Sequence, residues 1–309
     1  MNLRQNEQQR TRHAPAKLNF FLDILDRRED GYHELETLMV PIDLYDSLTM
    51  LPLAPSAGHA GNIEFTLRGA GPAAGIPDDS HNLVVRALNL LRERSGCQSG
   101  AKVELVKRIP SAAGLGGGSS DAATALELGN LVWGIHWPQT KLAELAAGLG
   151  SDVPFFLAHG AAICRGRGER VESLGATAPL HLIIAKPPTA LGTADVYRAL
   201  DQMPYESPSS RATGSSHSVF DLAAALQRGT LTQINRWMAN RLEAAAATLS
   251  PWVARLKSIF AEFDCLAHQL TGSGSAYFGV CRHAQHARRI ATILRMRQVG
   301  FVYAVRSCR

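Results

Sequence analysis

The amino-acid sequence predicts an α+β protein of two domains. Its 309 residues exceed the roughly 100–200 residues of a typical domain. Strand-like and helix-like runs are mixed along the chain, without the strict strand–helix–strand order of a doubly wound sheet. The pattern restarts around residues 165–180, so we expect domains at 1–175 and 176–309.

The first half predicts four strands, then a helix, a strand and two more helices. Short runs of apolar residues bounded by Gly or Pro predict strands at 17–25, 34–42, 47–53, 62–67 and 101–110. Apolar residues at helical spacing predict a helix over 81–96, and Gly96 predicts its end. An Ala-rich helix through about residue 130 and a helix ending at Gly150 follow. The loop at 53–61 separates two of the strands.

The second half begins with a buried strand at 181–188, closed by two prolines. Residues 206–218 are rich in Ser and Gly, which predicts a mobile loop. Helices are expected at 219–228, 231–248, 252–262 and 284–297, with a strand–turn–strand unit at 265–281 and a last strand at 301–307.

Composition excludes several classes of protein. Apolar residues make up 46% and charged residues 19%, which argues against a disordered chain. No run of 18 apolar residues occurs, so we expect no membrane-spanning helix. Five scattered cysteines without a CxxC pair argue against a zinc site, and they predict reduced thiols. With no secretory signal at the N-terminus, a cytoplasmic location is expected. The net charge of +5 is compatible with an anionic substrate.

The strongest local motif is GLGGGSS, within IPSAAGLGGGSSDAATAL (109–126). Consecutive glycines at the start of a helix cost stability, about 1 kcal/mol each within a helix. A loop without side chains, leading into a helix N-terminus, lets an anion approach free N–H groups closely. The motif is neither a Walker A loop nor GxGxxG. We interpret Pro110 to Ser120, called the glycine loop below, as a phosphate-binding segment; a flexible helix start without a ligand is the alternative.

Lys17 stands at the head of a predicted strand, and alternation places Asn19 on the same face. A lysine there is suited to neutralising phosphate charge or to lowering the pKa of a neighbouring nucleophile. Taken alone, the pattern favours a simpler interpretation, in which Lys17 extends along the strand end to water.

Three further segments each leave two interpretations open. Asp152 in GSDVPFF fits a general base, although an N-cap or Asx turn is the simpler role. Tyr32 and His33 follow the Asp-Gly turn signal at 30–31, so they fit either a base-stacking site or a hairpin cap. Glycines interrupt the strand pattern at 270–278, which indicates close approach to a ligand or an ordinary hairpin.

Taken in order, these segments resemble the GHMP kinase superfamily. PSAAGLGGGSSDAA is similar to its phosphate loop and TGSGSAYF to its C-terminal glycine motif. AKLN, GYHEL and SDVPFF are similar to one branch, whose acceptor is a diphosphocytidyl-linked polyol of non-mevalonate isoprenoid biosynthesis. The resemblance implies an N-terminal domain like domain 2 of ribosomal protein S5, a ferredoxin-like C-terminal domain and an active site in the cleft between them.

The resemblance also implies roles for residues of this chain. It makes Lys17 and Asp152 the catalytic pair and ATP with Mg²⁺ the phosphoryl donor, with no magnesium ligand assigned. The glycine loop, Pro110, Ser111, Ala112, Ala113, Gly114, Leu115, Gly116, Gly117, Gly118, Ser119 and Ser120, would bind the ATP phosphates. The substrate would contact Asn19, Tyr32, His33, Thr193, Tyr197, Gly272 and Ser273.

The expected partners are ATP and one small-molecule acceptor, without nucleic acid or membrane, in a monomer or weak homodimer. Two other functions remain open at this point. One is another GHMP kinase, acting on homoserine or mevalonate. The other is a non-catalytic nucleotide- or RNA-binding protein, since a fold does not fix a function. A chain that only binds would have no need of both Lys17 and Asp152.

Overall fold

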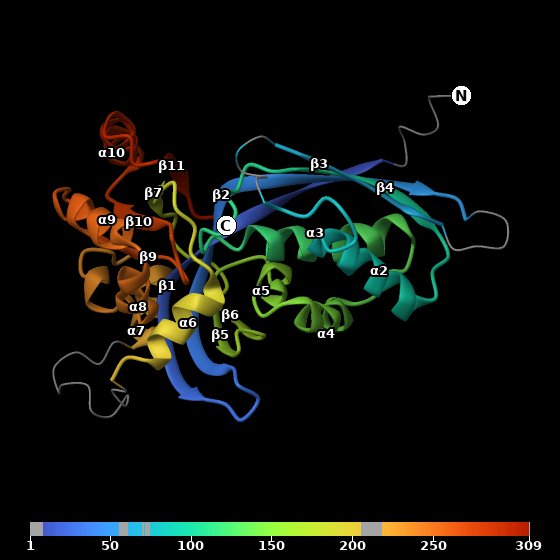
Figure 1. The fold of residues 1–309 in the computed structure, drawn as a ribbon, viewed down its shortest axis with the longest axis horizontal. Helices are drawn as coiled ribbons and strands as arrows, with labels where there is room; N and C mark the ends of the chain where they lie inside the picture. The colour runs from blue at the N-terminus through green and yellow to red at the C-terminus, as the bar shows by residue number, and fades with distance from the viewer. Residues whose placement is uncertain (1–8, 56–60, 70, 72–74, 205–217, 309) are drawn as a thin grey trace. The chain divides into compact units, whose positions relative to one another are not determined.

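A computed structural model describes residues 9–55, 61–69, 71, 75–204 and 218–308. The α+β class is confirmed (Figure 1). Most of the predicted loops at 53–61 and 206–218 lies outside the described residues. The chain forms two compact units. Unit 1 takes the chain up to Ala16, Leu44–Ser111 and Gly116–His159, and unit 2 takes Lys17–Asp43, Ala112–Leu115 and Gly160 onward.

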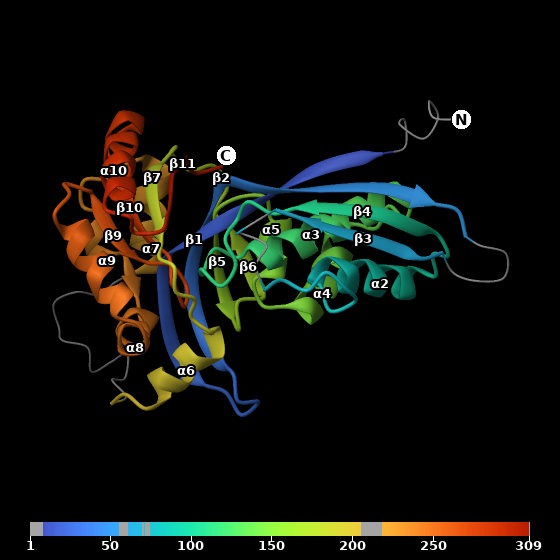
Figure 2. The ribbon, with the colours of Figure 1, turned by 45° about the horizontal axis from the view of Figure 1, so that its top comes forward.

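Unit 1 is a sheet with helices on one face (Figure 2). Its strands run in the order β3-β4-β2-β1, with β4 parallel to β3 and antiparallel to the end of β2. The strands are β1 (Arg10–Arg27), β2 (His33–Leu53), β3 (Ile63–Arg68) and β4 (Gly100–Val106). Unit 1 includes β1 up to Ala16 and β2 from Leu44 onward, and the rest of these two strands belongs to unit 2. The helices are α2 (Leu83–Ser95), α3 (Gly117–Val132), α4 (Gln139–Leu149) and α5 (Val153–Leu157).

Helix α2 illustrates how local sequence sets these elements. The Asn82 side chain accepts a hydrogen bond from the Val84 N–H at 3.0 Å, which caps the helix start. Gly96 takes the left-handed conformation with φ 73° and ends the helix. Val84, Leu88 and Leu91 recur at helical spacing and are buried. Both predicted ends of this helix are therefore confirmed to within two residues.

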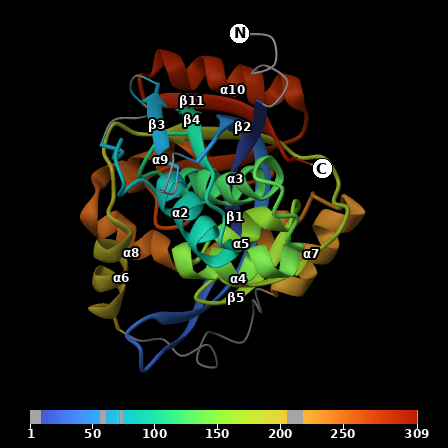
Figure 3. The same cartoon turned by 90° about the vertical axis from the view of Figure 1, so that its right-hand side faces the viewer.

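Unit 2 contains a second sheet, in the antiparallel order β11-β7-β10-β9. With intervening helices this is the strand order of a ferredoxin-like domain. Helix α10 lies along β11 (Figure 3). The strands of this sheet are β7 (His181–Lys186), β9 (Ala267–Leu270), β10 (Tyr277–Cys281) and β11 (Phe301–Arg306). The helices are α6 (Thr193–Asp201), α7 (Val219–Arg228), α8 (Leu242–Leu249), α9 (Pro251–Ala261) and α10 (Ala284–Met296).

Three short strands complete unit 2. β5 (Ala162–Gly166) pairs with the start of β2 and with β6 (Arg170–Ser173), and β8 (Ala239–Asn240) pairs in parallel with β1. Within the described residues, none of the helices is long and apolar enough to cross a membrane.

The predicted single helix over 231–248 is wrong. The segment forms a short 3₁₀ helix η1 (Ile234–Arg236), then β8, and only then α8. Asn240 explains the break, because its Nδ2 donates to the carbonyls of Leu270 and Gly272 while its Oδ1 accepts from the Leu242 N–H. Tertiary hydrogen bonds here override a helical pattern of apolar residues.

The strands predicted at 34–42 and 47–53 are one continuous strand, β2. The strand predicted to reach Pro110 ends at Val106, because residues after it turn toward the glycine loop. Strand β1 starts at Arg10, seven residues before the predicted start. The sequence pattern therefore located the strands but not their lengths.

Candidate active site

The glycine loop has a backbone that few side chains tolerate. Ala112, Gly114 and Gly116 have φ values of 46°, 73° and 71°. A Cβ on Gly114 would lie 2.1 Å from the carbonyl oxygen of Thr271, so only glycine fits there. The loop is also held by hydrogen bonds, from the Lys17 N–H to the Leu115 carbonyl at 2.9 Å and from the Ala276 N–H to the Ala113 carbonyl at 3.1 Å.

The end of the glycine loop is the start of α3, and this helix start has no side-chain cap. Its N-cap residue is Gly116, so no side chain accepts from the first N–H groups. The Ser120 hydroxyl is buried, and no partner for its oxygen lies among the described residues. Uncapped N–H groups and the helix dipole favour an anion at this position. The loop therefore fits the phosphates of ATP on its own geometry.

Lys17 is buried, with 3% of its surface exposed, so the simpler interpretation of a strand-end lysine reaching water is wrong. Its Nζ donates to Asn19 Oδ1 at 2.6 Å, as the predicted shared face requires. Asn19 Nδ2 donates to Thr37 Oγ1 at 2.8 Å, and Thr271 Oγ1 accepts from the Asn19 N–H at 3.0 Å. Lys17 thus belongs to a buried hydrogen-bonded network with Asn19, Thr37 and Thr271.

This network reaches the C-terminal glycine motif. Thr271 Oγ1 donates a hydrogen bond to the Gly114 carbonyl oxygen at 3.3 Å. Gly272 lies close to Asn19, because a Cβ on Gly272 would be 3.2 Å from Asn19 Oδ1. Ser273 Oγ lies 2.9 Å from Thr193 Oγ1. The structure therefore brings Asn19, Gly272 and the glycine loop together, and it pairs Thr193 with Ser273. Sequence reasoning assigned no role to Thr37, because a lone threonine in an apolar strand carries no local signal. It also assigned none to Thr271, although this residue begins the TGSGSAYF motif.

Tyr32 and His33 lie on the predicted turn. Gly31 has φ 83°, and Asp30 Oδ1 accepts from the Tyr32 N–H at 3.1 Å. The Tyr32 side chain is 54% exposed, and the Arg167 guanidinium carbon lies 5.0 Å from its ring centre. A large exposed ring fixed on a turn is suited to stacking on a flat ligand.

His33 is held from two sides. Its Nε2 lies 2.7 Å from Asp201 Oδ1, and its ring centre lies 5.0 Å from that of Tyr197. Tyr197 and Asp201 both come from α6, so this helix places two side chains against the turn. Sequence reasoning missed Asp201 and Arg167, because neither stands in a recognisable motif.

Asp152 belongs to unit 1 and stands at the N-cap position of α5. Its side chain makes no capping hydrogen bond to that helix, so the simple capping role is not what the structure shows. Pro154 follows within the first turn of the same helix, where its missing N–H costs nothing.

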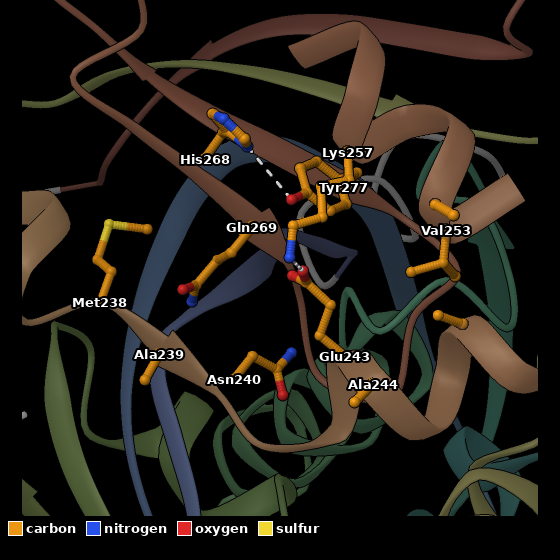
Figure 4. A pocket seen from close by; sticks show the side chains of 12 residues that line it. Met238, Ala239, Asn240, Glu243, Ala244, Val253, Lys257, His268, Gln269 and Tyr277 are labelled. Carbon is orange, nitrogen blue, oxygen red and sulfur yellow. Dashed lines mark hydrogen bonds and ion pairs between the residues drawn. The ribbon is translucent and has the colours of Figure 1, made fainter. Parts of the chain in front are cut away.

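A separate pocket of about 430 Å³ lies in unit 2, behind β9 and β10 (Figure 4). In it, Glu243 accepts from Lys257 Nζ at 2.8 Å, and His268 Nδ1 lies 3.2 Å from the Tyr277 hydroxyl. Burial lowers the pKa of His268 and raises that of Tyr277, which keeps both neutral. None of the predicted site residues lines this pocket.

The donor set for a metal is small. Across the described ranges, no three His, Cys, Asp or Glu side chains are grouped as metal ligands. Mg²⁺ commonly needs only one or two protein ligands when it is bound through substrate phosphates. The described residues therefore offer no separate metal cage.

Comparisons with known proteins agree with this geometry. Residues 82–160 match the family "GHMP kinases N terminal domain", and residues 222–297 match "GHMP kinases C terminal". A 4-diphosphocytidyl-2-C-methyl-D-erythritol kinase of Pelotomaculum thermopropionicum is 41% identical, over 90% of this chain and 91% of the relative. One of Bacillus cytotoxicus is 38% identical, over 95% of each chain.

Solved structures give the same picture. A crystal structure of 4-(cytidine 5'-diphospho)-2C-methyl-D-erythritol kinase superposes with a TM-score of 0.78 at 34% identity, covering 97% of this chain and all of that one. A homoserine kinase from Cytophaga hutchinsonii has a TM-score of 0.74 at 21% identity, covering 97% of this chain and 94% of that one. The second likeness shows a common fold only.

Proposed function

Because the chain belongs to the 4-diphosphocytidyl-2-C-methyl-D-erythritol kinase family of GHMP kinases, we propose how its residues perform that reaction. The chain is a kinase that transfers the γ-phosphoryl group of ATP to the 2-hydroxyl of 4-diphosphocytidyl-2-C-methyl-D-erythritol, in isoprenoid precursor synthesis. The observation that carries this assignment is 34–41% identity to such kinases over nearly the whole chain.

The glycine loop binds the β- and γ-phosphates in this proposal. Support comes from its uncapped helix start and from a backbone that leaves room for an anion. Phosphoryl transfer needs positioning and charge stabilisation more than covalent chemistry, and backbone N–H groups supply both. Magnesium bound with ATP neutralises phosphate charge and orients the γ-phosphoryl group.

Asp152 and Lys17 act on the acceptor in this proposal. Asp152 takes the proton of the acceptor's 2-hydroxyl while the oxygen of that hydroxyl forms a bond to the γ-phosphorus. The bond between the γ-phosphorus and the bridging oxygen breaks, and ADP leaves. Lys17 stabilises the negative charge that develops during phosphoryl transfer. A lysine held in a buried polar network is already desolvated and oriented for such a role.

The diphosphocytidyl group is recognised by residues of unit 2. We assign stacking on the cytosine to Tyr32 and hydrogen bonding to His33, whose ring is oriented by Asp201 and Tyr197. Asn19, Thr193, Gly272 and Ser273 lie along the rest of the substrate. We further propose a domain boundary at residue 175 and a cytoplasmic location. The protein would be a monomer or weak homodimer, without nucleic-acid or membrane partners.

A coupled ADP-release assay with Mg-ATP tests the function. The acceptors are 4-diphosphocytidyl-2-C-methyl-D-erythritol, homoserine and mevalonate, each at a saturating concentration. We expect turnover with the cytidyl acceptor alone. Turnover with homoserine or mevalonate instead would refute the proposed acceptor, and only the assignment to the GHMP kinases would stand.

A further inference from the structure

Three charged side chains are buried in unit 1, outside the residues assigned above. Asp46 comes from β2, Lys107 follows β4, and Asp121 lies just after the first turn of α3. Their exposed fractions are 0%, 3% and 3%. Charged groups are seldom buried unless they are paired, so this cluster requires an explanation.

Lys107 links the two carboxylates. Its Nζ donates to Asp121 Oδ2 at 2.6 Å and also to Asp46 Oδ2. Burial alone lowers the pKa of Lys107, but Asp121 and Asp46 outweigh burial and hold its pKa above the usual value. The lysine is therefore a fixed cation between two acids.

The cluster contacts the chain on both sides of the glycine loop. Asp46 Oδ1 accepts from the backbone N–H groups of Arg108 and Ile109 at 2.5 and 2.9 Å, directly before Pro110. Asp121 follows Ser120 directly, so its bond to Lys107 ties down the other end of the loop. One buried cluster thus holds both ends of an eleven-residue segment.

The cluster also touches the loop itself. A Cβ on Gly117 would lie 3.2 Å from Lys107 Nζ and 3.0 Å from Ile109 Cγ2. The first turn of α3 is therefore packed directly on the lysine and on the residue that Asp46 holds. Movement of the cluster would be transmitted to the N–H groups that face the phosphates.

Stability alone does not account for such a cluster. Replacing a buried ion cluster with apolar residues of similar volume is often neutral or stabilising. Groups that must present hydrogen-bond donors to a transferred phosphoryl group gain from being held rigidly before the ligand arrives. Fixed ends on a glycine-rich segment supply that rigidity.

We propose that Asp46, Lys107 and Asp121 are positioning residues, which hold the two ends of the glycine loop in the geometry that binds ATP. This inference rests on the proposed function of the loop. None of the three side chains needs to touch the nucleotide. Their effect passes through the Arg108 and Ile109 N–H groups and through the first turn of α3.

The test compares Asp46→Asn and Asp121→Asn with a matched control, Glu127→Gln. Glu127 lies on the same helix α3 and also loses a charge in an ion pair, with Arg12 and His159, but it does not contact the glycine loop. For each full-length protein we would measure MgADP affinity by calorimetry, KM for ATP and for the acceptor, and amide hydrogen exchange over residues 108–121. All measurements are made well below each unfolding temperature.

We expect both test variants to bind MgADP at least about tenfold more weakly and to lose up to about 100-fold in kcat/KM for ATP. Their KM for the acceptor should stay within about twofold of wild type, since acceptor residues are untouched. Exchange over 108–121 should be faster, and Glu127→Gln should change none of these values. If Asp46→Asn does not fold, Asp121→Asn decides the question, because the Asp121 variant keeps the hydrogen bonds that Asp46 accepts from the Arg108 and Ile109 N–H groups.

Variants that are less stable but bind MgADP as tightly as Glu127→Gln would overturn the inference and reduce the cluster to a structural one. A wild-type chain that binds no MgADP would overturn the proposed function of the loop, and the inference with it. The two failures are therefore distinguished by the wild-type titration.

Discussion

Two lysines of this chain are buried to the same extent, and each donates to a different kind of acceptor. Lys17 in unit 2 donates to the amide oxygen of Asn19, within a network of threonine hydroxyls. Lys107 in unit 1 donates to two carboxylates, Asp46 and Asp121. Each lysine has 3% of its surface exposed. Burial alone therefore does not distinguish a structural lysine from a reactive one.

The chemistry of the partners does distinguish them. A carboxylate pair compensates the ammonium charge and makes the lysine costly to remove. The amide oxygen of Asn19 orients the Lys17 ammonium, which suits a group that acts on a developing negative charge. We therefore assign positioning to Lys107 and catalysis to Lys17, and the following experiments test that contrast.

The largest effect is expected at the carboxylate that we pair with Lys17 in the reaction. Asp152→Asn should lower kcat by about 10²–10⁴-fold with both substrates saturating, because Asn cannot accept the hydroxyl proton. Because the Asp152 side chain makes no capping hydrogen bond to α5 and Asn has nearly the same volume, the melting temperature should hardly change. A near wild-type rate would remove Asp152 from the role of base.

Matched substitutions test the two lysines directly. Lys107→Met should cost about 3–5 kcal/mol of unfolding free energy, because two buried carboxylates lose their cation. Lys17→Met should cost about 1–3 kcal/mol for the Asn19 amide oxygen that loses its donor. It should nevertheless lower kcat about 10²–10³-fold. Urea unfolding and steady-state kinetics on both variants check this, and equal stability losses would break the contrast.

The contrast also shows where sequence reasoning works. The glycine loop was predicted from composition alone, because consecutive glycines at a helix start have few structural uses. The turn before Tyr32 and the shared face of Lys17 and Asn19 follow from local rules, and both are confirmed. Helices with clear caps, such as α2, were placed nearly correctly.

What sequence reasoning missed depends on contacts between distant segments. Lys107 follows a strand and resembles any exposed charged residue, and Asp46 and Asp121 lie 61 and 14 positions away. Only the folded sheet and helix bring the three together. The same holds for β8, where pairing with β1 replaced the predicted helix. The strand pattern taken alone favoured a Lys17 side chain that reaches water, because such a pattern does not show what packs on the end of the strand.

Acidity gives a finer test of the Lys107 cluster. Burial, together with the Asp46 carboxylate, raises the pKa of Asp121 to about 7 against the opposing effect of Lys107. Because the folded chain then binds this proton more tightly than the unfolded chain, the stabilisation is present at low pH and is lost as pH rises from about 4 to 7. The difference in unfolding free energy between wild type and Asp121→Asn should therefore fall as pH rises, by up to about 1.4 kcal/mol per pH unit.

Urea unfolding at several pH values between 4.5 and 8 measures this difference. Other titrating groups occur in both proteins and largely cancel in the comparison. A difference that stays flat, or that rises with pH, would mean that Asp121 is ionised throughout and that the cluster carries a net negative charge at neutral pH.

The smallest effect is expected at the rim of the substrate site, where Tyr32 is more exposed than either lysine. Tyr32→Ala should raise KM for the cytidyl acceptor about tenfold and leave KM for ATP unchanged, since stacking of a base on an aromatic ring contributes about 1–3 kcal/mol. Phe220→Ala is a matched control, because Phe220 is also exposed and lies under an arginine, Arg165. An unchanged acceptor KM in Tyr32→Ala, or an equal rise of this KM in both variants, would mean that the Tyr32 ring stabilises the turn and does not stack on the cytosine.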